Sequence, residues 1–341
     1  MMRKIWPWLR LLVAVVILAV LVWRLGTGAF VAGLRVIDTP AIVAALAIGL
    51  LTTVLSAWRW CLVARKLDLP LGLGTAVSDY YQALLLNAVL PAGVVGDVNR
   101  AVSHGRESGN VGRGVRAVLL ERLAGQVVLL VIGVVVLLAD PGLVSAVVPA
   151  RDILIAVGIV LAAAVAIAGW KRWGPSAGRR AVATALADGR LGLLSRDTWP
   201  VVALLSAATI AGHVAMFVVA ARAAGLTAPV GQLLPLMVLA LVVMGLPINI
   251  GGWGPREGFS ALAFGAAGLG ATPGLTTAVV YGVLTLVASL PGALVLLLRR
   301  VRVQDSKLSR YWAKASTRLA SRSLPFAAVA RDGRPITPDS V

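Results

Sequence analysis

The stretch Leu246-Pro247-Ile248-Asn249-Ile250-Gly251-Gly252-Trp253-Gly254-Pro255-Arg256-Glu257-Gly258 lies within strongly apolar sequence. It contains two prolines, four glycines and an adjacent arginine and glutamate. An uninterrupted membrane helix does not tolerate this combination, because proline breaks the backbone hydrogen-bond pattern and charged groups are costly in hydrocarbon. The stretch therefore predicts a helix that is broken within a membrane.

A second stretch, Leu90-Pro91-Ala92-Gly93-Val94-Val95-Gly96-Asp97-Val98-Asn99-Arg100, has the same layout. In both, a Leu-Pro pair precedes a glycine five residues after the proline and an arginine nine residues after it. Broken, charged segments at matching places in the two halves of a membrane chain are typical of a transporter's binding site. We therefore expect the two stretches to form one site.

The composition indicates an integral membrane protein. The 341-residue chain is 59% hydrophobic and 13% charged, with a mean hydropathy of +0.91, whereas soluble domains carry about 25% charged residues. The net charge of +18 does not indicate nucleic-acid binding, because the basic residues cluster between apolar runs, as in proteins beside anionic lipid headgroups. The single cysteine, Cys61, excludes an internal disulfide, and with two histidines we expect no metal or other cofactor.

Apolar periodicity and length predict an all-α membrane protein of about six transmembrane helices and two re-entrant helical hairpins. The helices are expected near residues 9–30, 39–64, 115–139, 152–170, 199–221 and 274–298. The first hairpin has its first arm at 75–90 and breaks at the second quoted stretch, and the second comprises 230–246 and 255–269. We expect residues 171–196 to form a basic loop and 303–341 a basic, disordered cytoplasmic tail.

The charge distribution predicts the orientation. With both termini in the cytoplasm of a bacterium and the chain in its inner membrane, 26 of the 32 lysines and arginines fall on the cytoplasmic side. The transmembrane domain, residues 1–302, then divides into repeats 9–140 and 151–300. One hairpin enters from each side, so the repeat is inverted, and such repeats place a substrate near the bilayer midplane.

The second predicted hairpin supplies the sharpest candidate ligand. Gly254 suits the N-cap and Pro255 the first helical position, which places Arg256 and Glu257 in the first turn. Free backbone N–H groups and a guanidinium would both attract an anionic headgroup, phosphate above all. The alternative is that Arg256 forms an internal ion pair with Glu257 or Glu121.

Further charged and polar groups complete the predicted substrate site. Asp97 either faces the substrate or caps the second arm of the first hairpin, with Arg100 one turn on. Glu121 and Arg122 are adjacent on a helix and need different partners, and we expect Glu121 to pair with Arg100 or Arg256. The predicted substrate-binding residues are Arg256, Glu257, Arg100, Asp97, Glu121, Arg122, Asn249, Gly252 and Gly254.

Other polar residues have two readings. Asn87, Tyr80, Tyr81 and Gln82 either line the cavity or, for the tyrosines, anchor the chain at the membrane interface. His213 is a core or pore-lining histidine rather than a catalytic one. His104 lies in a polar loop and receives no role.

Three short motifs carry a resemblance to a known family. They are Leu90-Pro91 through Gly96-Asp97 and Arg100, then Glu121-Arg122-Leu123-Ala124-Gly125, then Leu246-Pro247 through Glu257. At these residues, and in hydropathy from about 11 to 300, the chain resembles the lysylphosphatidylglycerol synthase transmembrane-region family, also called flippase-like domain proteins. In the multiple peptide resistance factor such a domain flips aminoacylated phosphatidylglycerol, while a soluble domain transfers the amino acid. The resemblance implies the membrane portion without the transferase.

The sequence thus favours a translocator of an anionic phospholipid or lipid-linked headgroup. Because the chain has no nucleotide-binding motif, we expect transport to be either facilitated, down the lipid's own gradient, or coupled to another gradient. One alternative is a membrane-embedded transferase acting on a lipid carrier, with Glu121, Glu257, Asp97 and His213 as the available acid–base groups. Another is a scaffold for a cell-envelope biosynthetic enzyme, docked through the basic tail. We expect a membrane lipid as the partner and no nucleic acid.

Overall fold

The structure is a computed structural model that describes residues 35–90, 94–139, 176–193, 195–245 and 254–299. Contacts divide the chain into two compact units, residues 1–293 and 294–341, and the packing described below belongs to the first. All regular secondary structure in these ranges is helical. The predicted helices at 9–30 and 152–170, the disordered tail, and residues Asn249 and Gly252 lie outside the described ranges.

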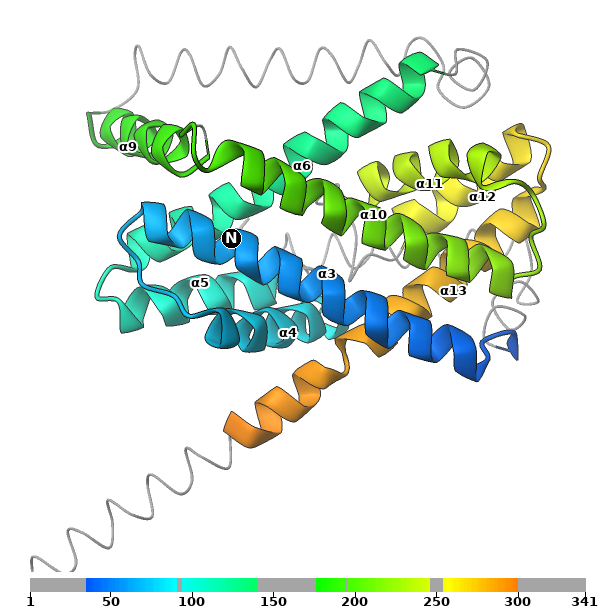
Figure 1. Cartoon of the computed structure of the whole chain (residues 1–341), viewed down its shortest axis with the longest axis horizontal. Helices are drawn as coiled ribbons and strands as arrows, with labels where there is room; N and C mark the ends of the chain where they lie inside the picture. Colours follow the sequence, from blue (N-terminus) through cyan, green and yellow to red (C-terminus); the bar gives the residue numbers. More distant parts are fainter. Residues whose placement is uncertain (1–34, 91–93, 140–175, 194, 246–253, 300–341) are drawn as a thin grey trace, which may run out of the picture. The chain divides into compact units, whose positions relative to one another are not determined.

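The described helices follow the order expected from the apolar runs (Figure 1). They are α3 (Thr39–Lys66), α4 (Leu73–Val89), α5 (Val95–Glu107), α6 (Val111–Ala139), α9 (Ser176–Leu193), α10 (Trp199–Ala223), α11 (Val230–Met244), α12 (Pro255–Ala266) and α13 (Ala271–Ser289). Four are long and apolar enough to cross a membrane: α3, α6, α10, and α13 with its extension to Arg299. The predicted helices at 39–64, 115–139, 199–221 and 274–298 are therefore confirmed as helices.

Small residues set the spacing between the long helices. At Gly49 of α3 a Cβ would approach the Cβ of Ala288 in α13, and at Gly212 of α10 it would overlap Thr52 of α3. Small residues at such crossings let helix backbones approach closely, which is how apolar helices gain packing energy where hydrophobic association is weak. The pair α3 and α10 thereby forms a central element against which α6 and α13 also pack.

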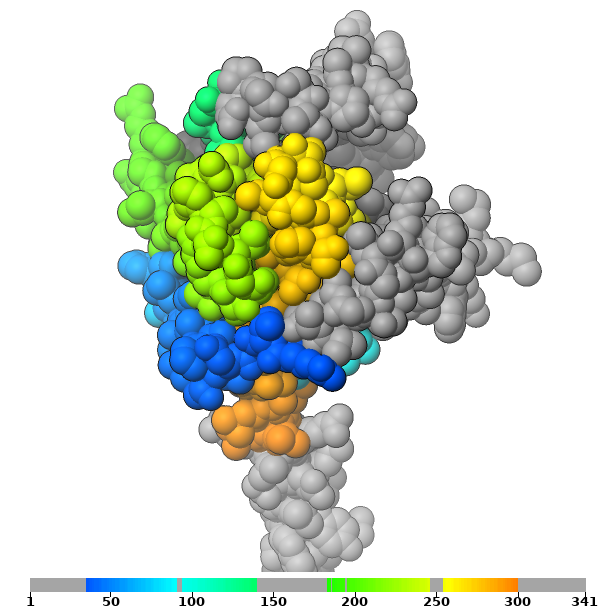
Figure 2. All heavy atoms as spheres, turned by 90° about the vertical axis from the view of Figure 1, so that its right-hand side faces the viewer, coloured from blue at the N-terminus to red at the C-terminus, as the bar shows by residue number. Residues whose placement is uncertain are grey.

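Each broken stretch separates two short helices that pack against each other. In the first half α4 lies against α5, and there is no room for a side chain at Gly96, because its Cβ would overlap the backbone of Ala83. In the second half α11 lies against α12, as seen side by side in Figure 2 (yellow-green and yellow). Neither α4, α5, α11 nor α12 is among the four helices with the length and hydropathy of a span.

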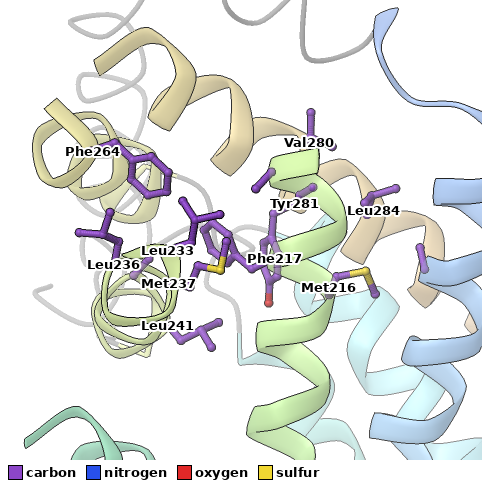
Figure 3. Close-up of a cluster of buried hydrophobic side chains, with 14 of the residues drawn as sticks. Met216, Phe217, Leu233, Leu236, Met237, Leu241, Phe264, Val280, Tyr281 and Leu284 are labelled. Carbon is purple, nitrogen blue, oxygen red and sulfur yellow. The ribbon is translucent and has the colours of Figure 1, made fainter. Parts of the chain in front are cut away.

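An apolar cluster fixes α11 in place. Its face carrying Leu233, Leu236 and Met237 packs toward Phe264 of α12, and the neighbouring ring of Phe217 stacks on Tyr281 with centroids 4.5 Å apart (Figure 3). All of these side chains are buried. Packing of this kind gives the second half an apolar core, and the buried guanidinium of Arg256 lies beside its Tyr281 ring.

Two predictions about loops are wrong. Residues 176–193 form α9 rather than a loop; this segment contains five alanines, which favour helix, and it packs on α3 and α6, where Arg116 pairs with Asp188. His104 lies within α5 and is buried, with its ring edge-on to Trp60 at 5.6 Å between centroids. In both cases polar composition indicated a loop, although one apolar face was sufficient for helix packing.

Candidate functional site

A cavity of about 630 Å³ lies between the two halves of the first compact unit. Side chains from α3, α4, α5, α6, α10, α11, α12 and α13 line it. Most of the lining is apolar, and its polar groups include Thr52, Asn87, Asp97, Arg122, Gln126, His213 and Arg256. An apolar pocket of this size with a few convergent polar groups is the usual form of a small-molecule or headgroup site.

Asp97 and Arg122 form the charged part of the cavity wall. Asp97 lies in the first turn of α5, where its Oδ2 accepts hydrogen bonds from Arg122 Nη2 at 2.6 Å and Asn87 Nδ2 at 3.0 Å. Its Oδ1 accepts from Arg100 Nε at 2.9 Å. Burial by itself would raise the pKa of the Asp97 carboxyl, but Arg122 and then Arg100 outweigh burial and hold the pKa below its usual range. The carboxyl is therefore ionised at neutral pH.

The side chain of Arg122 is the most exposed member of this cluster, at 46%, whereas that of Asp97 is 14% exposed. It lies eleven residues into α6, roughly 16 Å along the helix axis. An arginine within an apolar membrane helix needs a counter-ion or a wet cavity. Arg122 has both, because Asp97 faces it and the cavity surrounds it.

Behind the cavity wall, Glu121 is the centre of a buried ion network. Its Oε1 accepts from Arg59 Nε at 3.1 Å, Arg59 Nη2 at 2.5 Å and Tyr80 OH at 3.1 Å, and its Oε2 accepts from Arg100 Nη2 at 2.7 Å. Arg59 also donates to Ser206 Oγ of α10 at 2.9 Å. A fully buried carboxylate needs this many donors because its desolvation is costly. The network thereby connects five helices: α3, α4, α5, α6 and α10.

Arg100 is held by rings as well as by carboxylates. Its guanidinium carbon lies 4.3 Å from the centroid of the Tyr80 ring and 4.7 Å from that of Trp60. Its side chain is fully buried. Cation–π contacts gain strength in such a desolvated site, so Arg100 is a structural member of the network and does not face the cavity.

The corresponding arginine of the second half, Arg256, is also buried and paired. It forms an ion pair with Glu257, and its guanidinium carbon lies 5.0 Å from the centroid of the Tyr281 ring. The second carboxyl oxygen of Glu257 accepts a hydrogen bond from Gly254 N at 2.7 Å. Glu257 therefore neutralises Arg256 and satisfies one backbone N–H at the start of α12.

His213 of α10 and Tyr281 of α13 lie on the cavity wall, where Tyr281 OH and His213 Nδ1 are 3.2 Å apart. The prediction of a core or pore-lining histidine is confirmed. In the described ranges no group of three histidine, cysteine or acidic side chains has the geometry of a metal site.

Residues 8–292 match the family described as the lysylphosphatidylglycerol synthase TM region. The chain belongs to this family. The match covers both broken stretches and every described helix except the extension beyond residue 292. Together with the four long apolar helices it establishes that this family member is a helical membrane protein of the lipid-handling, flippase-like kind. No curated protein and no solved structure matches the chain.

In this family member, the predicted start of α12 is confirmed: Gly254 is the N-cap with φ of 101°, and Pro255 is the first helical residue. The alternative that Arg256 pairs with Glu257 is the arrangement observed. The alternative that Asp97 caps α5 is wrong, since α5 begins two residues earlier and the carboxylate contacts side chains instead. Glu121 pairs with Arg100, as expected, and not with Arg256.

Sequence reasoning missed Arg59. The side chain of Arg59, which the positive-charge distribution assigns to the cytoplasmic end of the helix predicted at 39–64, is 6% exposed and contacts Glu121. Its position seven residues before Lys66, two turns inside α3, is the signal that separates it from interfacial arginines. Tyr80 and Tyr81 are likewise buried, so they do not anchor the chain at an interface.

Proposed function

We propose that this chain translocates an anionic phospholipid, or the anionic headgroup of another lipid, across the bacterial inner membrane. The cavity between the two halves is the binding site in this proposal. The observation that carries it is the Arg122 side chain, which has 46% of its surface accessible in the wall of a cavity that is otherwise mostly apolar. An amphipathic cavity of this kind suits a charged headgroup with an attached acyl chain.

The charge balance supports an anion rather than a cation. The network around Asp97 and Glu121 contains two carboxylates and three guanidiniums, those of Arg59, Arg100 and Arg122. The two broken connections, residues 91–93 and 246–253, contain no ionisable residue. The Arg256–Glu257 pair adds no net charge. An excess of one positive charge beside the cavity favours a phosphate oxyanion there.

The helix arrangement supports the proposed inverted repeat with two re-entrant hairpins. The helices α3, α4, α5 and α6 begin 160, 157, 160 and 160 residues before α10, α11, α12 and α13. Contacts follow the same correspondence: α5 packs on α6 as α12 packs on α13, and α4 packs on α13 as α11 packs on α6. Inverted repeats of transporters place their substrate where the broken helices of both halves meet.

The proposed orientation, with both termini cytoplasmic, rests on the distribution of lysine and arginine. A cell-envelope biosynthetic enzyme that supplies or consumes the lipid is the partner we propose, docked on the basic cytoplasmic side. Within the proposed site, Arg122 contacts the headgroup directly. Arg100, Glu121, Glu257 and Gly254 position the broken helices, and Asp97 and Arg256 form part of the wall. Asn249 and Gly252, which lie outside the described residues, stay predicted substrate-binding residues.

A reconstitution experiment tests this function. Full-length protein in liposomes of neutral lipid receives trace fluorescent phosphatidylglycerol or fluorescent phosphatidylcholine, and dithionite quenching reports the rate of transbilayer movement. We expect movement of phosphatidylglycerol at a rate well above that in protein-free liposomes, and a reduction of at least tenfold for Arg122→Gln, because a charge-assisted contact to phosphate is lost.

The matched control is Asp188→Asn, which removes a charge from the Arg116–Asp188 pair outside the cavity. It should transport at the rate of the wild type. Equal rates for the wild type, Arg122→Gln and empty liposomes would overturn the proposed function. A covalently modified lipid formed in the same liposomes would instead indicate a transferase.

A further inference from the structure

The three arginines of the cluster around Asp97 and Glu121 differ in their access to the cavity. The side chains of Arg59 and Arg100 are 6% and 0% exposed, and both contact the buried Glu121. Arg122 is 46% exposed and contacts Asp97. Exchange of a partner requires access to the incoming group, and among these three Arg122 has it.

Asp97 would keep two hydrogen-bond donors if one of its three donors moved away. It accepts three side-chain hydrogen bonds, from Arg122, Asn87 and Arg100. Asn87 is itself fixed, because its Oδ1 accepts from Gly96 N at 2.8 Å. If Arg122 turned away, the carboxylate would keep a guanidinium and an amide donor, so it would not be left as a buried, unpaired charge.

We propose that Arg122 exchanges partners: Asp97 holds its guanidinium in the empty cavity, and a phosphate oxyanion of the substrate takes the place of that carboxylate when it binds. A phosphate presents two oxygens to the fork of a guanidinium as a carboxylate does, which makes the replacement geometrically equivalent. Asp97 thus acts as a competitor that tunes anion affinity. This inference deepens the proposed function and rests on it for the identity of the lipid.

The exchange explains why a translocator would place a carboxylate beside its anion ligand. A substrate that must be released on the other side cannot be bound by an uncompensated guanidinium, since the complex would be too stable to dissociate quickly. Competition from Asp97 lowers the net gain on binding and returns Arg122 to a paired state after release. Arg256 does not fit this role, because its side chain is 2% exposed and its partner Glu257 is also bonded to the backbone of Gly254.

A double-mutant cycle on anion binding tests the exchange. Isothermal titration of full-length protein in an uncharged detergent measures the affinity for dihexanoylphosphatidylglycerol and, separately, for inorganic phosphate. Asp97→Asn should bind the lipid about five- to tenfold more tightly, because the competing charge is gone. Arg122→Gln should bind it roughly 10- to 100-fold more weakly. In the Arg122→Gln background, Asp97→Asn should change the affinity by less than about twofold.

The cycle separates exchange from a general field effect. Removing a negative charge raises anion affinity in either background if only long-range attraction matters, so an equal gain with and without Arg122 would overturn the proposal. Asp188→Asn, which removes a negative charge elsewhere, should leave the affinity unchanged. If Asp97→Asn does not fold, Asn87→Asp takes its place: a second carboxylate beside Arg122 should weaken lipid binding, and unchanged or tighter binding would overturn the exchange.

The two proposals fail in different ways. Transport of phosphatidylglycerol that requires Arg122, combined with no gain in affinity for Asp97→Asn, removes the exchange and retains the function. The predicted pattern of affinities without transport retains the exchange and removes the function. If the predicted affinity changes occur with inorganic phosphate and not with the lipid, the exchange is supported, but a lipid headgroup is not the source of the phosphate.

Discussion

Arg100 of α5 and Arg256 of α12 each follow the proline of their broken stretch by nine residues, and both are buried beside a glutamate. The glutamates come from different places. Glu121 lies on another helix, α6, and also serves Arg59 of α3 and Tyr80 of α4. Glu257 is the next residue in the chain, and it also accepts from the backbone at the start of its own helix.

The difference shows that a buried arginine can be neutralised by a glutamate from another helix or by one that is adjacent in the chain. In the first half the carboxylate connects several helices, so its loss should affect the packing of the whole half. In the second half the carboxylate neutralises its neighbour and closes one helix end, while an apolar cluster holds α11 and α12. The first segment thus combines an apolar cluster with an ion network that joins several helices, whereas the ion pair of the second segment is local.

The largest effect should come from Glu121→Gln. The substitution leaves Arg59 and Arg100 buried with no carboxylate between them, and breaking a buried ion network costs about 3–5 kcal/mol. We expect the midpoint of thermal unfolding in detergent to fall by many degrees, or the protein to aggregate. A midpoint within one degree of the wild type would show that the network is not essential for the first half.

Glu257→Gln should have a smaller effect, and this tests the comparison directly. The amide oxygen can still accept from Gly254 N, and the change leaves a single buried guanidinium without its carboxylate, so the cost should lie near the lower end of about 3–5 kcal/mol. Thermal unfolding of both single variants, measured side by side, should rank Glu257→Gln as the milder. The reverse order would contradict the distinction between a tertiary and a local carboxylate.

Glycine substitutions give the third test, with a matched pair of positions. Gly96→Ala places a methyl group against the backbone of Ala83 and should destabilise the α4–α5 contact by roughly 1–3 kcal/mol. Gly258, in the first turns of α12, has open space around it, so Gly258→Ala should be neutral or stabilise by up to about 1 kcal/mol. Thermal unfolding in detergent provides the measurement: a lower midpoint is expected for Gly96→Ala alone.

Several features of the fold followed from the sequence because they are local. Apolar runs of sufficient length predicted α3, α6, α10 and α13, and the order Gly254, Pro255, Glu257 predicted the start of α12, since these residues suit the first positions of a helix. Family membership was also predicted from three short motifs. The predictions of loops at α9 and at His104 are wrong, because a polar segment can form either a loop or a helix with one apolar face.

The sequence did not predict which acidic and basic side chains form ion pairs with one another. The position of Arg59 two turns inside α3 separates it from the basic residues that end the helix, but nothing local indicates its partner, Glu121, which is 62 residues away in the chain. The sequence suits Asp97 equally to a helix cap, and it favours Arg256 over Arg122 as the ligand. The observed exposures, 2% for Arg256 and 46% for Arg122, reverse that order.

The sequence by itself determined that this is a helical membrane protein with two charged breaks, because hydropathy, proline and glycine act over a few residues. The tertiary structure alone decided which charges neutralise one another and which side chain faces the cavity. The physical reason is that a carboxylate at membrane depth takes whichever donors the packed helices bring within about 3 Å, and that distance depends on every crossing in the bundle.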